Sequence, residues 1–121
     1  MSDTIKGSYQ NITAWKKGFR LSVSIYKLSQ SFPPDERFGL TSQMRRSSVS
    51  IPSNIAEGYA RGSKKEFHHF LRIAYASGAE PETQIALAKE IFDYPLSAYQ
   101  ETDTLLQEVM KMLNTMLYSD H

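Results

Sequence analysis

The chain has 121 residues, of which 40% are hydrophobic and 22% charged, and it contains no cysteine. This length suits one domain that buries about two-thirds of its unfolded surface, and the lack of cysteine excludes disulfides and thiolate chemistry. No stretch approaches the roughly 20 apolar residues of a membrane helix, and the first ten residues lack a signal-peptide core, so we expect a cytoplasmic protein.

The net charge of +1 hides an uneven distribution along the chain. Residues 1–72 hold 12 Lys and Arg against 5 Asp and Glu, a balance of +7, whereas residues 73–121 hold 2 against 8, a balance of −6. A basic half attracts phosphate, as nucleic-acid-binding surfaces do. The same distribution arises when helices of the two halves pack side by side and neutralise each other, and the pI near 8.0 favours this second interpretation.

Apolar residues recur at helical spacing throughout, and no run alternates apolar and polar residues as a strand does. The first predicted helix runs from about Thr13 to Ser31 and ends before Pro33 and Pro34, because proline disfavours helix in the residue before it. One apolar stripe of this helix consists of Leu21, Ile25, Leu28 and Phe32, and a second consists of Trp15, Phe19, Ser22 and Tyr26.

The second predicted helix begins near Thr41 or Ser42, both good N-cap residues, and ends near Arg61. Pro52 lies inside this helix, where it removes a backbone donor, so we expect a kink. Gly62 is a natural left-handed stop after the helix. The apolar stripe consists of Met44, Ser48, Ile51, Ile55 and Tyr59.

The third predicted helix opens with a capping box of Ser63 and Glu66, and the short link makes it an antiparallel neighbour of the second. Pro81 should bend or break it around residues 77–81. Its first seam consists of Phe67, Leu71, Ala74, Gly78, Pro81, Ile85, Ala88 and Phe92. Its second seam consists of Phe70, Ile73, Ser77, Glu80, Gln84, Leu87 and Ile91. Two adjacent apolar seams indicate neighbours on both sides, as in a bundle.

The fourth predicted helix begins with a second capping box, formed by Ser97 and Gln100. Its heptad seam consists of Leu106, Val109, Leu113 and Met116. Four segments of about 20 residues joined by short links predict an all-α, antiparallel four-helix bundle of up-down-up-down topology, kinked at Pro52 and Pro81. We expect residues 13–118 to form this bundle and residues 1–12 to be a flexible N-terminal segment.

Polar side chains follow one face of the second helix at steps of three and four, and a matching patch lies on the third. Buried groups of this kind need hydrogen-bond partners, because an unpaired one costs about 1–3 kcal/mol. We predict that these residues form a structural polar layer: Gln43, Ser47, Ser50, Asn54, Glu57, Ser77, Glu80 and Gln84. The sequence leaves open whether this layer lies within one subunit or between subunits.

The basic residues around the second and third helices suggest a different hypothesis, which is that they contact the phosphates of a nucleic acid. The candidates are Arg45, Arg46, Arg61, Lys64, Lys65 and Arg72. A solvated basic face without a ligand is the alternative.

Catalytic and metal sites are not expected. His68 and His69 are adjacent, so on a helix they point about 100° apart and do not form a two-ligand grip. Glu66 and His69 have the Glu-x-x-His spacing of di-iron bundles, but such a site needs two of these pairs and two further glutamates. We therefore expect no catalytic residue, metal, cofactor or small-molecule substrate.

The segment around residues 45–58 also resembles the sequence motifs of a known protein family. Its most specific part is Arg45-Arg46-Ser47 followed by Val49-Ser50-Ile51-Pro52-Ser53-Asn54-Ile55-Ala56-Glu57-Gly58. Further matching parts are Phe38-Gly39-Leu40-Thr41-Ser42-Gln43 and Glu82-Thr83-Gln84. In these motifs the chain resembles the bacterial four-helix-bundle proteins of the 23S rRNA-intervening-sequence family, sometimes filed as ribosomal proteins. Pro81 departs from the family pattern, which has leucine between the two glutamates.

The resemblance implies the bundle fold and a homo-oligomer, a pentameric ring. It also implies association with genes found inside ribosomal RNA intervening sequences, and a related group binds nucleic acid through a basic surface while assisting reverse transcriptases. We therefore expect a non-enzymatic oligomeric protein, associated with RNA or a ribonucleoprotein through its basic half. The alternative is a protein–protein scaffold or adaptor without a nucleic-acid role.

Overall fold

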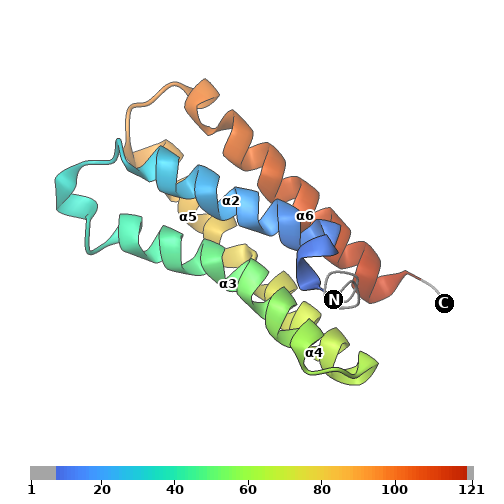
Figure 1. The fold of residues 1–121 in the computed structure, drawn as a ribbon. Coiled ribbons are helices and arrows are strands. Elements are labelled where there is room, and N and C mark those ends of the chain that lie inside the picture. Colours follow the sequence, from blue (N-terminus) through green and yellow to red (C-terminus); the bar gives the residue numbers. More distant parts are fainter. Residues whose placement is uncertain (1–7, 120–121) are drawn as a thin grey trace.

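The computed structural model describes residues 8–119, which form helices and turns without any strand. The long helices are α2 (Thr13–Ser29), α3 (Leu40–Ala60), α4 (Lys64–Ser77), α5 (Ala79–Ile91) and α6 (Gln100–Tyr118), and the short 3-10 turns are η1 (Tyr9–Asn11), η2 (Pro34–Glu36) and η3 (Leu96–Tyr99). The predicted all-helical bundle is confirmed, and the chain path in Figure 1 agrees with the up-down-up-down order, with α4 and α5 counted as one rod. Within the described residues, no helix has the length and apolarity of a bilayer span.

The inner apolar stripe predicted for each helix supplies the core. Its completely buried side chains include Leu21, Ile25, Met44, Ile51, Ile55, Ala74, Ala88, Val109 and Leu113. Each buried Leu, Ile, Val or Met contributes about 1.5–3 kcal/mol relative to an exposed position, so these stripes are the main stabilising term. Of the N-terminal segment predicted to be flexible, residues 9–11 form η1, and residues 1–7 lie outside the described part of the chain.

The C-terminal end of α3 packs against α4 at close range. At Gly58, a Cβ would lie 2.6 Å from Cβ of Phe70 and 3.2 Å from the carbonyl oxygen of Phe67. Real Cβ atoms essentially never approach a backbone or Cβ atom that closely, so a side chain here would push α4 away from α3. Gly58 therefore fixes the distance between α3 and α4.

Pro52 lies inside α3, which runs without interruption from Leu40 to Ala60. Because proline has no N–H, the carbonyl of Ser48 lacks its usual partner within the helix. The hydroxyl of Ser22 in α2 donates to that carbonyl at 3.1 Å. Gly18 of α2 lies against the same turn, where a Cβ would be 3.4 Å from the Pro52 ring. The backbone group that proline leaves unpaired thus joins α2 to α3.

The predicted break of the third helix is confirmed at Gly78, since α4 ends at Ser77 and α5 begins at Ala79. Pro81 causes it, because it cannot donate to the carbonyl of Ser77 four residues earlier. Gly78 packs against the end of the Met110 side chain of α6, and this flexible end would have to move to make room for a Cβ.

Two predicted helix caps are wrong. α3 begins at Leu40, and its first N–H groups are not capped by Thr41 or Ser42; the Glu36 carboxylate accepts the Leu40 N–H at 3.2 Å instead. The capping box of Ser97 and Gln100 does not form, because η3 occupies residues 96–99 and α6 begins directly after it. This 3-10 turn places the ring of Tyr99 in the core with none of its surface exposed, and burial of that ring outweighs a surface cap.

The contact at Gly58 predicts that a glycine-to-alanine substitution, which usually stabilises a helix, lowers the free energy of unfolding here. Alanine in a helix interior normally stabilises by about 1 kcal/mol relative to glycine. We expect Gly58→Ala instead to lower the free energy of unfolding by about 2 kcal/mol, because overpacking against Phe70 outweighs the helix propensity. Urea titration followed by circular dichroism measures the change. Ser53→Ala, on the exposed side of α3, is the control and should stay within about 0.5 kcal/mol; a more stable Gly58→Ala protein would contradict the close approach.

Candidate nucleic-acid interface

The turn between α3 and α4 is built by two local signals that the sequence predicts. Gly62 has a φ of +87°, the left-handed conformation that glycine adopts without strain. The hydroxyl of Ser63 then accepts the N–H of Glu66 at 3.1 Å and caps α4. The reversal is therefore only three residues long, and it brings the end of α3 beside the start of α4.

This turn gathers four of the six predicted phosphate-binding residues, Arg61, Lys64, Lys65 and Arg72, and all four are exposed. Arg61, Lys65 and Arg72 line a surface depression of about 440 Å³, together with the acidic Glu66, His69 and Phe70. The Arg61 guanidinium lies 4.9 Å from the centre of the Phe70 ring and bonds to Glu57 Oε2 at 3.0 Å. Lys64, Lys65 and Arg72 have no ion pair among the described residues.

Arg45 and Arg46 do not join this cluster. They precede Arg61 by 16 and 15 residues on the same helix, which separates them from it by about 23 Å. Arg45 is also engaged within the fold: its Nε donates to the Ser29 hydroxyl at 2.8 Å, and its guanidinium lies 4.6 Å from the centre of the Tyr26 ring. Arg46 is exposed. The six candidates thus form two groups at opposite ends of α3.

The predicted polar layer comes together at one point between helices. The buried hydroxyl of Ser47 in α3 donates to Oε1 of Gln84 in α5 at 2.7 Å. Three other members bond to the backbone of their own helix: Ser50 donates to the Ser47 carbonyl, Asn54 to the Ser50 carbonyl and Ser77 to the Ile73 carbonyl. The layer is therefore a short inter-helix link with local bonds beside it.

Gln43, Glu57 and Glu80 were predicted in the same layer, but they are exposed in the single chain. Glu57 is paired with Arg61. The stripe lies at the edge of the contact between the helices, so its outer members face solvent. A three-and-four spacing places residues on one face without determining how deep that face lies.

The histidines lie in separate surroundings, as the 100° offset predicts. His68 Nε2 lies 3.2 Å from the carbonyl oxygen of Leu117 in α6, and the His69 ring packs edge-on against Phe70 at 5.2 Å. Within residues 8–119, no three His, Asp or Glu side chains come together at metal-binding distances.

The structure distinguishes between the two interpretations of the uneven charge. Among the described residues, one ion pair joins the basic and the acidic half of the chain: Lys17 Nζ lies 2.9 Å from Glu108 Oε1. The other pairs lie within a half, with Arg61 bonded to Glu57 and Glu66, and Lys89 bonded to Asp103. Packing of the helices therefore leaves most of the basic charge without a direct counter-charge.

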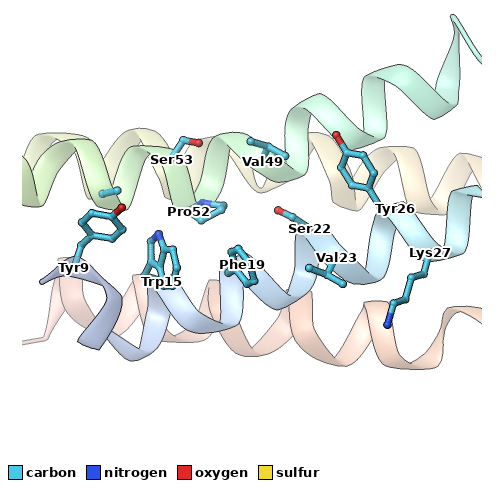
Figure 2. Close-up of a pocket in the computed structure, with 11 residues that line it drawn as sticks. Tyr9, Trp15, Phe19, Ser22, Val23, Tyr26, Lys27, Val49, Pro52 and Ser53 are labelled. Carbon is cyan, nitrogen blue, oxygen red and sulfur yellow. The ribbon is translucent and has the colours of Figure 1, made fainter.

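A second surface was not identified as a site from the sequence. Between α2 and α3 lies the aromatic groove, about 460 Å³ in volume, with Tyr9, Trp15, Phe19 and Tyr26 along one wall (Figure 2). The spacing of its α2 residues was interpreted as a second apolar stripe, but Phe19 is 51% and Tyr26 45% exposed. The signal that could have identified it is the absence of acidic residues from residues 13–29, which contain four Lys and Arg.

Comparisons with known proteins agree with this fold. No curated protein matches the chain significantly. A crystal structure at 1.70 Å resolution, of a protein with unknown function from the S23 ribosomal protein family of Bacteroides thetaiotaomicron VPI-5482, superimposes with a TM-score of 0.76. The two sequences are 24% identical, and the alignment covers 88% of this chain and 99% of that one. The family described as 23S rRNA-intervening sequence protein matches residues 10–115. This protein therefore belongs to the 23S rRNA-intervening sequence protein family.

Proposed function

We propose that this protein is a non-enzymatic, homo-oligomeric bundle that binds RNA, free or within a ribonucleoprotein, through the basic turn between α3 and α4. The observation that carries the proposal is the uncompensated charge at this turn. Lys64, Lys65 and Arg72 are exposed and unpaired within the described residues, at a reversal formed by Gly62 and Ser63.

The cations of the turn do not by themselves distinguish RNA from an acidic protein, because phosphates and carboxylates would both pair with them. What favours RNA is the combination of Lys and Arg with partly exposed rings, since His69 and Phe70 line the same depression. RNA-binding surfaces pair phosphate contacts with rings on which bases stack. The family's name refers to intervening sequences of 23S rRNA, which supports the same partner by association.

The proposed homo-oligomer rests on the second seam of the third predicted helix. In the single chain its apolar members lie at the surface, with Ile73 37%, Leu87 47% and Ile91 61% exposed. Gln84 and Glu80 lie between them on the same face. A long apolar seam with polar residues inside it is typical of a subunit contact, where the polar groups fix the register. We propose that this seam joins copies of the chain in a ring, with five copies as the family resemblance implies.

The role proposed here requires no catalytic group, cofactor, metal or small-molecule substrate. It also requires a cytoplasmic location, where RNA is available. These statements are parts of the proposal, and a purified protein that contained stoichiometric metal would contradict them.

The basic turn can be tested through the salt dependence of RNA binding. Lys64→Gln/Lys65→Gln should weaken binding to a hairpin RNA and reduce the slope of log affinity against log salt by about 2, because each lysine that contacts a phosphate releases about one counterion. Fluorescence anisotropy between about 50 and 200 mM salt measures the slope. Arg37→Gln/Lys111→Gln changes the net charge equally at exposed positions elsewhere and serves as the control. Equal slopes for the two double variants would exclude the turn as the binding surface.

The oligomer contact can be tested independently of RNA. Leu87→Lys/Ile91→Lys places two charges on the exposed seam without touching the core of one chain. Light scattering should then show the mass of the wild-type assembly fall to that of single chains of 13.8 kDa. Val23→Lys, at an exposed apolar position on α2, should leave the assembly intact. A wild-type protein that is already a single chain in solution would contradict the proposal.

A scaffold or adaptor without a nucleic-acid role is the second candidate, and one observation favours it. Phe38 is 88% exposed on the link between α2 and α3, which suits contact with another protein. Pull-down from lysate, with and without nuclease, distinguishes the two functions. Partners that are lost after nuclease treatment support RNA, whereas partners that remain support the scaffold.

A further inference from the structure

The aromatic groove between α2 and α3 is a second surface on which rings and cations meet. The Trp15 and Phe19 rings stack with their centres 5.2 Å apart and their planes 25° apart. Tyr9 packs edge-on against Trp15 at 5.3 Å, so the three rings form one continuous wall (Figure 2). Phe19 and Tyr26 keep about half of their surface exposed, although aromatic side chains are usually buried.

The opposite wall belongs to α3 and includes Val49, Pro52 and Ala56. The two walls are held in place by the bond from Ser22 to the Ser48 carbonyl and by the contact of Gly18 with Pro52. Because α2 and α3 already touch at these points, the rings cannot fold inward to bury themselves. The groove is therefore preformed, and its apolar surface is available to a flat ligand.

The charge around the groove is mostly positive, although Glu101 of α6 lines the adjoining depression together with Arg20 and Lys27. Lys16, Arg20 and Lys27 follow one side of α2 at helical spacing, and Lys27 lines the groove itself. Arg46 lies one turn before Val49 on α3. None of these four has an ion pair among the described residues, and no carboxylate lines the groove. A ligand of the groove is thus expected to be anionic along its edge.

We infer that the aromatic groove binds single-stranded nucleic acid, with unpaired bases against the rings of Phe19 and Tyr26 and phosphates along Lys16, Arg20 and Lys27. An unpaired strand joins flat apolar faces to a regular row of anions, which is the combination that these two rows of side chains match. Base pairs in a duplex hide their faces from side chains, so the groove discriminates against duplex. This inference rests on the proposed RNA binding and names the form of RNA that a second surface takes.

Trp15 is the only tryptophan in the chain, so its fluorescence reports on the groove directly. Oligouridylate should quench Trp15 emission to saturation, whereas inorganic polyphosphate, which has the charges without the bases, should not. Phe19→Leu should weaken oligouridylate binding about tenfold, the usual loss for one stacking ring. Phe38→Leu changes an exposed ring outside the groove and should have no effect. Both positions are exposed, so circular dichroism of the two variants should equal that of the wild type.

Four outcomes would overturn the inference. Three are equal quenching by polyphosphate, equal quenching by a blunt-ended RNA duplex without unpaired bases, and unchanged binding by Phe19→Leu. The fourth is displacement of the oligonucleotide from the groove by an acidic amphipathic peptide that binds more tightly, which would assign the groove to a protein helix. The hairpin of the salt-dependence test separates this inference from the proposed function. A protein that binds the hairpin through Lys64 and Lys65 while Trp15 remains silent toward oligouridylate retains the proposed function and loses the groove. If oligouridylate still quenches Trp15 in Lys64→Gln/Lys65→Gln and the wild type does not bind the hairpin, binding in the groove is retained and RNA binding at the basic turn is lost.

Discussion

Close packing of α3 against two neighbours is the constraint on which the rest of the structure depends. On one side, Gly58 lets the backbone of α4 approach to a distance that excludes a Cβ. On the other, Pro52 leaves the Ser48 carbonyl free for Ser22 of α2. Both contacts depend on a small residue or on proline, which lacks a backbone N–H, rather than on large apolar residues. They determine where the two candidate surfaces lie, since the basic turn follows the first contact and the aromatic groove surrounds the second.

This constraint explains why the most specific part of the sequence lies in residues 45–58. These positions meet three neighbouring helices: the Ser47 hydroxyl bonds to Gln84 of α5, the Ser48 carbonyl and the Pro52 ring contact α2, and Gly58 packs against α4. A larger residue at any of these positions would separate α3 from α2, α4 or α5. The motif is therefore accounted for by packing, and the basic and aromatic side chains beside it are the residues that packing does not require.

The helices, their inner stripes and the local signals at Gly62, Ser63 and Pro81 could be predicted because each depends on residues close together in the chain. The starts of α3 and α6 could not, since Glu36 and Tyr99 act there through contacts that a capping motif does not contain. The second seam shows a different limit. Its spacing correctly placed Ile73, Leu87 and Ile91 on one face, but spacing cannot tell whether the neighbour of that face belongs to the same chain.

The candidate site was predicted only as a set of residue types. Six basic residues within 28 positions suggest one patch, yet the length of α3, a helix of 21 residues, separates Arg45 and Arg46 from the turn by about 23 Å. The aromatic groove was missed because Phe19 and Tyr26 satisfy an apolar stripe equally well when buried and when exposed. What separates the two cases is the size of the neighbours on α3: Pro52 and Ala56 are too small to cover the rings.

The two candidate surfaces are arranged along the same helix, and this arrangement links them. Ala56 lines the aromatic groove and precedes Arg61 by five residues, about 7.5 Å along the axis of α3. Trp15 and Tyr9 line that same groove from α2 and η1, so rings and cations follow α3 from Val49 to its end. A folded RNA commonly joins a paired stem to an unpaired segment. The turn presents cations without a continuous wall of rings, and the groove presents both. Arg61 also lies about 140° around the axis of α3 from Ala56, so an RNA molecule that occupied the two surfaces at once would have to wrap around this helix.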